Sequence, residues 1–173
     1  MAAADSNAHL SLGRESVVVG TNVMRADLSL NRGGAGFRVV VALKTRNILF
    51  IEPGQKAARW LLPDNDHIMS DSSDIRVAAT NGNAQRMIAT AVLVKSTTGS
   101  TESVSGKLLL FAPSGRTIVE VANNVRNIHP TSLSGGDLTI LYERNRRLVL
   151  AAFDPGSLAK RGSRRSTFPN PSE

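Results

Sequence analysis

Short apolar segments rich in β-branched residues follow one another along the chain, separated by Gly, Pro, Asn and Asp. Successive segments start roughly 8 to 12 residues apart, which leaves room for tight turns but none for a helical crossover. Parallel strands need such a crossover, so neighbouring segments are expected to pair antiparallel as a meander. The spacing therefore predicts an all-β fold of about twelve strands. The segments are 15–19, 22–29, 37–43, 47–52, 57–62, 75–79, 86–95, 104–112, 116–122, 126–131, 137–142 and 147–153.

An internal repeat runs through three of these segments. Each contains an apolar run that ends at phenylalanine and continues into a turn with proline and glycine. Proline presets φ at the start of such a turn, and glycine adopts the positive φ that other residues resist. A second strand follows the first two turns, which predicts hairpins there. The three segments are 47–54, 107–115 and 148–156.

The segment from Asn47 to Trp60 resembles the blade hairpins of β-propeller families, especially the pyrroloquinoline-quinone-type and TolB-type repeats, because Gly54, Lys56 and Trp60 occur in that order. Residues 37–158 are also similar to uncharacterised bacterial proteins of unassigned function. The resemblance implies an incomplete or small propeller-like array of three blades, whereas closed propellers have at least about four. The Gly-His and Trp-Asp signatures of WD40 blades are missing. A β-sandwich or a barrel of the same strands is the alternative fold.

Composition at the two ends predicts one domain, residues 13–158, between disordered flanks. Residues 1–12 are small and polar, and residues 159–173 form a basic tail with proline and serine. The 173 residues include no cysteine, which excludes disulfides, cysteine-ligated metals and thiol chemistry. The propeller resemblance implies a periplasmic or cell-envelope setting, with an export signal or membrane anchor ahead of Met1 in the native protein. The cytoplasm is the alternative, and any membrane contact would need such a further segment.

Basic residues cluster at two places in the C-terminal third of the chain. The net charge is +7, and the segment after residue 155 holds four basic residues against one glutamate. A second cluster lies at a predicted hairpin turn, where a solvated polar turn is the alternative interpretation. Single-strand nucleic-acid binders usually add stacking rings, and Trp60 and Tyr142 are the only Trp and Tyr. The candidate anion-binding residues are Arg144, Arg146, Arg147, Lys160, Arg161, Arg164 and Arg165.

The densest polar stretch offers weak candidates for a metal site at Asp64, Asp66, Asp71 and Asp74. An EF-hand loop that started at Asp64 would need Gly and Glu at the positions of Met69 and Ile75. Loop carboxylates that cap turns are the alternative. The three histidines lack metal-ligand spacing, and no Gly-x-Ser-x-Gly motif occurs. We therefore expect no catalytic residues and no cofactor.

These features favour a non-enzymatic protein-binding or scaffold module. Too few blades to close a ring would leave sheet edges that a protein partner or a second copy must cover, so a homodimer is one expectation. The alternative function is binding of a polyanion, either nucleic acid or anionic lipid, through the basic turn and tail. A third possibility is an enzyme that uses Asp64, Asp66 and His67. No small-molecule substrate is indicated.

Overall fold

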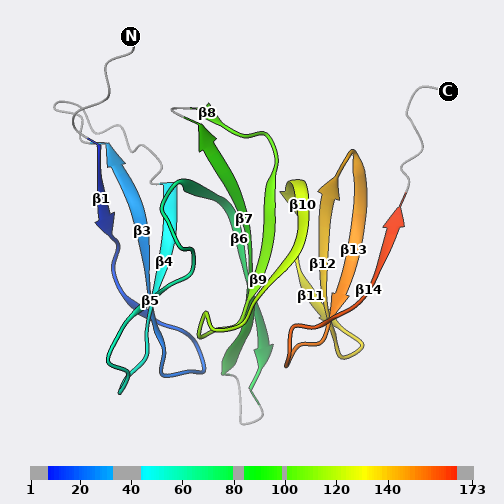
Figure 1. Cartoon of the computed structure of the whole chain (residues 1–173). Helices are drawn as coiled ribbons and strands as arrows, with labels where there is room; N and C mark the ends of the chain where they lie inside the picture. Colours follow the sequence, from blue (N-terminus) through cyan, green and yellow to red (C-terminus); the bar gives the residue numbers. More distant parts are fainter. Residues whose placement is uncertain (1–7, 33–43, 80–83, 99–100, 167–173) are drawn as a thin grey trace.

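The computed structural model describes residues 8–32, 44–79, 84–98 and 101–166. Figure 1 shows an all-β chain whose strands lie side by side, with β1 at one end and β14 at the other. The described residues contain no helix of the length and apolarity needed to span a membrane. The strands are β1 (Ala8–Leu12), β2 (Ser16–Val17), β3 (Met24–Arg32), β4 (Lys44–Ile51), β5 (Arg59–Trp60), β6 (His67–Ala78), β7 (Gln85–Thr98), β8 (Thr101–Glu102), β9 (Gly106–Phe111), β10 (Ile118–Ile128), β11 (Ser132–Ser134), β12 (Asp137–Arg144), β13 (Arg147–Phe153) and β14 (Lys160–Ser166).

The longer strands form one open antiparallel sheet in the order β1-β3-β4-β6-β7-β9-β10-β12-β13-β14. Short strands attach beside this path, with β2 on β3, β5 on β4, β8 on β7 and β11 on β12. The predicted all-β antiparallel meander is confirmed. Separate propeller blades would interrupt the hydrogen-bond path, which instead runs from β1 to β14. The division into three blades is not confirmed.

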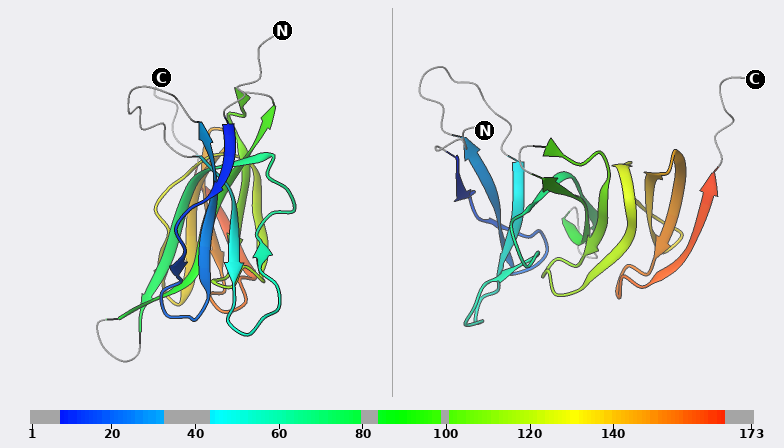
Figure 2. Two further views of the ribbon diagram at one scale, coloured as in Figure 1. Left: turned by 90° about the vertical axis from the view of Figure 1, so that its left-hand side faces the viewer. Right: turned by 45° about the horizontal axis from the view of Figure 1, so that its top comes forward.

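The central strand β7 is buried on both faces, which explains its nearly continuous apolar sequence. Ala89, Ala91 and Leu93 face what we call the C-terminal core, which gathers buried side chains mainly from β6, β7, β9, β10, β12 and β13. Val92 and Val94 face the N-terminal core, formed with β4, β9 and residues in 18–23 and 61–62. The sheet therefore curves over one face of β7 in its first half and over the other face in its second half, as Figure 2 illustrates.

The repeat has a packing role within the N-terminal core. Phe50 and Phe111, the phenylalanines of the first two repeats, meet edge to face with ring centroids 5.8 Å apart. Glu52, in the first repeat's turn, accepts two hydrogen bonds from Arg116, which follows the second turn, at 3.0 and 2.8 Å. These hydrogen bonds lower the pKa of Glu52. The two repeat turns are thus tied to each other by a direct ion pair.

Both ends of the predicted domain need correction. Residues 8–12 and 160–166, expected within disordered flanks, form strands that pair with β3 and β13. An edge strand pairs half of its backbone groups with its one neighbour and leaves the other half to solvent. A polar segment can therefore form an edge strand without burying apolar side chains. Residues 1–7 and 167–173, and the predicted strand at 37–43, lie outside the described residues.

The polar stretch after Asn65 was expected to be a loop, but it forms most of β6 (His67–Ala78). Register pairs join it to β7 from His67↔Ser96 to Ala78↔Gln85, with two β-bulges. Its central side chains, Ser70 to Ser72, are exposed. Strand formation here depends on the buried neighbour β7, which supplies backbone partners regardless of the side chains that face solvent.

Candidate anion-binding site

The hairpin of β12 and β13 places two arginines at its tip. Asn145 and Arg146 form the connection, with positive φ of 52° and 58°. Positive φ at both central positions is typical of two-residue hairpins, because the resulting twist matches that of the strands. Arg144 and Arg147 are consequently direct cross-strand partners. Paired residues project from the same face of a sheet, so both side chains lie on the face of the C-terminal core.

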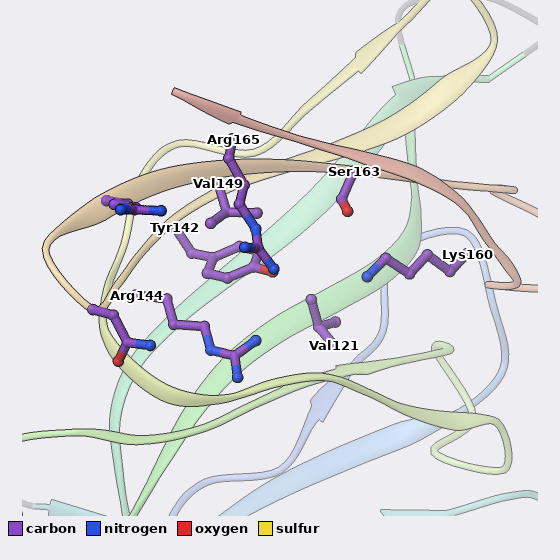
Figure 3. A pocket seen from close by; sticks show the side chains of 9 residues that line it. Val121, Tyr142, Arg144, Val149, Lys160, Ser163 and Arg165 are labelled. Atoms are coloured by element: carbon purple, nitrogen blue, oxygen red, sulfur yellow. The ribbon is translucent and has the colours of Figure 1, made fainter. Parts of the chain in front are cut away.

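A pocket of about 410 Å³ opens on this face beside the hairpin. Its apolar part comes from Val121 on β10 and Val149 on β13, next to the nearly buried ring of Tyr142. Figure 3 shows basic side chains from the hairpin and from β14 directed into the space above Val121 and Tyr142. The lining residues are Val121, Tyr142, Arg144, Asn145, Arg147, Val149, Lys160, Ser163 and Arg165.

A β-bulge brings Lys160 into the pocket. Regular alternation along β14 would place residues 160 and 163 on opposite faces of the sheet. The register, however, shifts between Ala152↔Gly162 and Phe153↔Lys160, so that one residue of β14 is skipped. Lys160 therefore projects from the same face as Ser163 and Arg165. The skipped residue, Arg161, pairs with Asp137 at 2.6 Å and also with Asp154.

The pocket is strongly positive. None of its lining residues is acidic, and no salt bridge to Arg144, Arg147, Lys160 or Arg165 occurs within the described part of the chain. The Nε atom of Arg144 is buried and has no hydrogen-bond partner there. Buried donors without partners are rare, because desolvation of an unpaired polar group is costly. The pocket thus presents an unpaired cationic donor.

Tyr142 contributes a neutral donor to the same space. Burial raises the pKa of its hydroxyl, and the charges of Arg144 and Arg165 partly oppose this rise. The hydroxyl therefore stays protonated at neutral pH and can donate a hydrogen bond to an anion. Three guanidinium groups, an ammonium group and a phenol on one apolar floor can hold a phosphate or carboxylate group.

The structure separates the seven predicted anion-binding residues into two groups. Arg144, Arg147, Lys160 and Arg165 line the pocket. Arg146 occupies the turn, Arg161 is ion-paired, and Arg164 lines another hollow of about 410 Å³ on the opposite face. Tyr142, Ser163 and the floor valines were not predicted. The alternation of side chains along a strand could have identified Tyr142, because it lies two residues before Arg144 and therefore on the same face.

The four predicted metal candidates do not gather. Asp64 accepts hydrogen bonds from the amide of Asp66 at 3.0 Å and from the imidazole of His67 at 2.8 Å. Asp74, on β6, accepts a hydrogen bond from Thr90 at 2.8 Å and pairs with Arg25 at 3.2 Å. The extended β6 keeps Asp71 and Asp74 away from the turn. Among described residues, no three acidic or histidine side chains form a metal-binding group.

His67 also borders a second cavity, of about 500 Å³, on the face of the N-terminal core. Its floor includes Leu62, Val94 and Leu109, and Ser96, the cross-strand partner of His67, lies at its wall. The ion pair of Lys107 and Glu120, 3.0 Å apart, forms part of its rim. This cavity is mainly apolar and offers no cluster of like charges comparable to the basic pocket.

No protein-family model, curated protein or solved structure matches the chain. The resemblance to propeller repeats stays a prediction, and function is inferred from the geometry of the basic pocket.

Proposed function

We propose that the chain is a non-enzymatic binding module whose basic pocket holds an anionic group of its ligand. One observation carries this proposal: four cationic side chains, none paired with an acid among the described residues, surround the buried Tyr142. Like charges in one confined space repel each other, and this cost is relieved when an anion binds. The unpaired Nε of Arg144 supplies a donor that such an anion would satisfy.

The size of the pocket favours a compact anionic group over an extended polyanion. About 410 Å³ accommodates a phosphate-bearing or carboxylate-bearing group with a few apolar atoms on Val121 and Val149. Tyr142 is 2% exposed and offers no free ring face for a base, and Trp60 lies on β5 in the other half of the sheet. The site therefore suits an anionic protein segment or small molecule better than single-stranded nucleic acid.

For the partner and the cellular setting of the module, the proposal follows the expectations from the sequence. A protein partner fits a module without a catalytic set, and a cell-envelope setting follows only from the propeller resemblance. Self-association is a further expectation. The C-terminal end of the sheet opposes it, because two copies of the basic β14 would repel each other. A homodimer would more readily use β1, which holds no Lys, Arg, Asp or Glu.

Titration calorimetry with pyrophosphate at low ionic strength tests the proposal. The unmodified protein and the Arg144→Ala, Arg165→Ala and Arg126→Ala variants are compared. Arg126 is exposed on β10 outside the pocket and provides a control of equal charge change. We expect about a tenfold loss of affinity for each pocket variant and no loss for the control. Equal affinities across all four proteins would overturn the proposal.

A further inference from the structure

Among the described strands, β14 pairs along one edge only. β14 pairs with β13 over its length, from Leu148↔Ser166 to Phe153↔Lys160, and with no other described strand. An edge strand presents a row of free N–H and C=O groups that can pair with an added strand. β14 is seven residues long, so it offers a template long enough for a peptide segment.

The side chains of β14 make this edge selectively positive. Lys160 and Arg165 project into the basic pocket, and Arg164 projects from the opposite face. Arg161 is neutralised by Asp137 and Asp154, but Arg164 has no salt bridge within the described residues. An added strand would therefore meet unpaired positive charge on both of its faces.

The other end of the sheet has a different character. β1 holds no acidic or basic residue apart from His9, and Leu10 and Leu12 are 47% and 51% exposed. A second copy of β14 would place basic side chains opposite basic side chains, which is destabilising. Charge thus discriminates between possible partners at β14 and favours a segment rich in Asp or Glu.

We propose that β14 accepts an acidic, extended segment of a partner protein as an additional strand, with one carboxylate of that segment in the basic pocket. This inference rests on the proposed function and specifies its ligand class. Backbone hydrogen bonds along the edge would supply affinity that does not depend on sequence. The pocket would bind acidic side chains at alternate positions, because these lie on one face of a strand, and Arg164 would attract acidic side chains at the intervening positions.

Strand addition is tested with a fluorescently labelled peptide of four Glu-Thr repeats, whose binding is followed by anisotropy. Two analogues keep the charge of the parent peptide. One carries N-methyl groups on the glutamate amides, and the other carries them on the threonine amides. Only one set can face β14, so we expect one analogue to bind at least about tenfold more weakly and the other to match the parent. Hydrogen exchange should slow at amides of residues 160–166 when the parent peptide binds.

Variants locate the peptide on the sheet. All glutamates of this peptide face one side when it is extended, so Arg165→Ala, on the pocket face, should weaken binding about tenfold. Arg164→Ala, on the face that meets threonine, and the control Arg126→Ala should not. Equal binding of the parent and both methylated peptides would overturn strand addition but leave the anion pocket standing. Peptide binding without protection of β14 would overturn it as well. Failure of pyrophosphate to bind would instead overturn the pocket, so the two proposals fail in different experiments.

Discussion

Arg144 and Arg147 face each other directly across the β12–β13 hairpin and project from the same face of the sheet. Within the described residues, neither guanidinium is paired with a carboxylate. Like charges at directly opposed positions destabilise an antiparallel pair. The hairpin is therefore less stable than its backbone geometry allows, and an anion between the two side chains would remove that cost.

Replacing one of these arginines by an acid should abolish anion binding and increase the stability of the fold. In Arg147→Glu, a cross-strand pair of opposite charges replaces the repulsion, so we expect unfolding to cost about 0.5 to 1 kcal/mol more at low salt. The gain should shrink at high salt, because ions screen exposed charges. Pyrophosphate binding should be lost. Urea denaturation at two salt concentrations measures the first effect, and a variant that is no more stable at low salt would contradict it.

The turn of the same hairpin offers a stabilising change that leaves the pocket intact. Arg146 has φ of 58°, in the region where a side chain collides with its own backbone. Arg146→Gly should therefore raise the free energy of unfolding by about 1 kcal/mol. Asn145→Gly, at φ of 52°, should gain less, because asparagine tolerates this region. Denaturant midpoints rank the two variants, and an unchanged pyrophosphate affinity in Arg146→Gly is expected because Arg146 does not line the pocket.

The second repeat turn leaves no room for a side chain at Gly115. A Cβ there would lie 2.6 Å from the ring of Phe50, and φ is +67°. Gly115→Ala combines backbone strain with a clash in the N-terminal core, so we expect a loss of about 2 to 4 kcal/mol. Gly54→Ala is the matched control, because φ is +83° but nothing lies within 4 Å. It should lose only about 1 to 2 kcal/mol. Equal losses in chemical denaturation would show that the Phe50 contact is unimportant.

Stability should fall in acid as Asp154 becomes protonated. Its pKa is lowered from 3.8 to about 2, first by the hydrogen bonds from the backbone and side chain of Ser157 and then by Arg161. A carboxylate with a depressed pKa in the folded state stabilises the protein above its unfolded pKa and loses this contribution as pH falls. Unfolding free energy should therefore decrease between about pH 4 and 2. Asp154→Asn should be less stable at pH 7, and its pH dependence in this range should be flatter.

Several features of the fold follow from local sequence alone. The alternation and spacing of β-branched segments predict antiparallel strands, because each short turn allows only a neighbouring partner. The basic clusters at 144–147 and 160–165 are visible as charge along the chain. Lys160 could not be assigned to the pocket in advance, since its side chain faces the pocket only because a bulge skips Arg161.

By itself, the sequence determined the strand class, the antiparallel order and the residues available for anion binding, because these depend on local propensity, turn length and charge. Tertiary structure decided that the first two repeats pack in one core, as the contact of Phe50 with Phe111 shows, whereas Phe153 of the third repeat packs in the C-terminal core. It also decided that residues 160–166 of the predicted tail form β14, because β13 supplies the hydrogen-bond partners that the segment lacks on its own. The pocket exists only where the twisted sheet brings β10, β12, β13 and β14 around Tyr142.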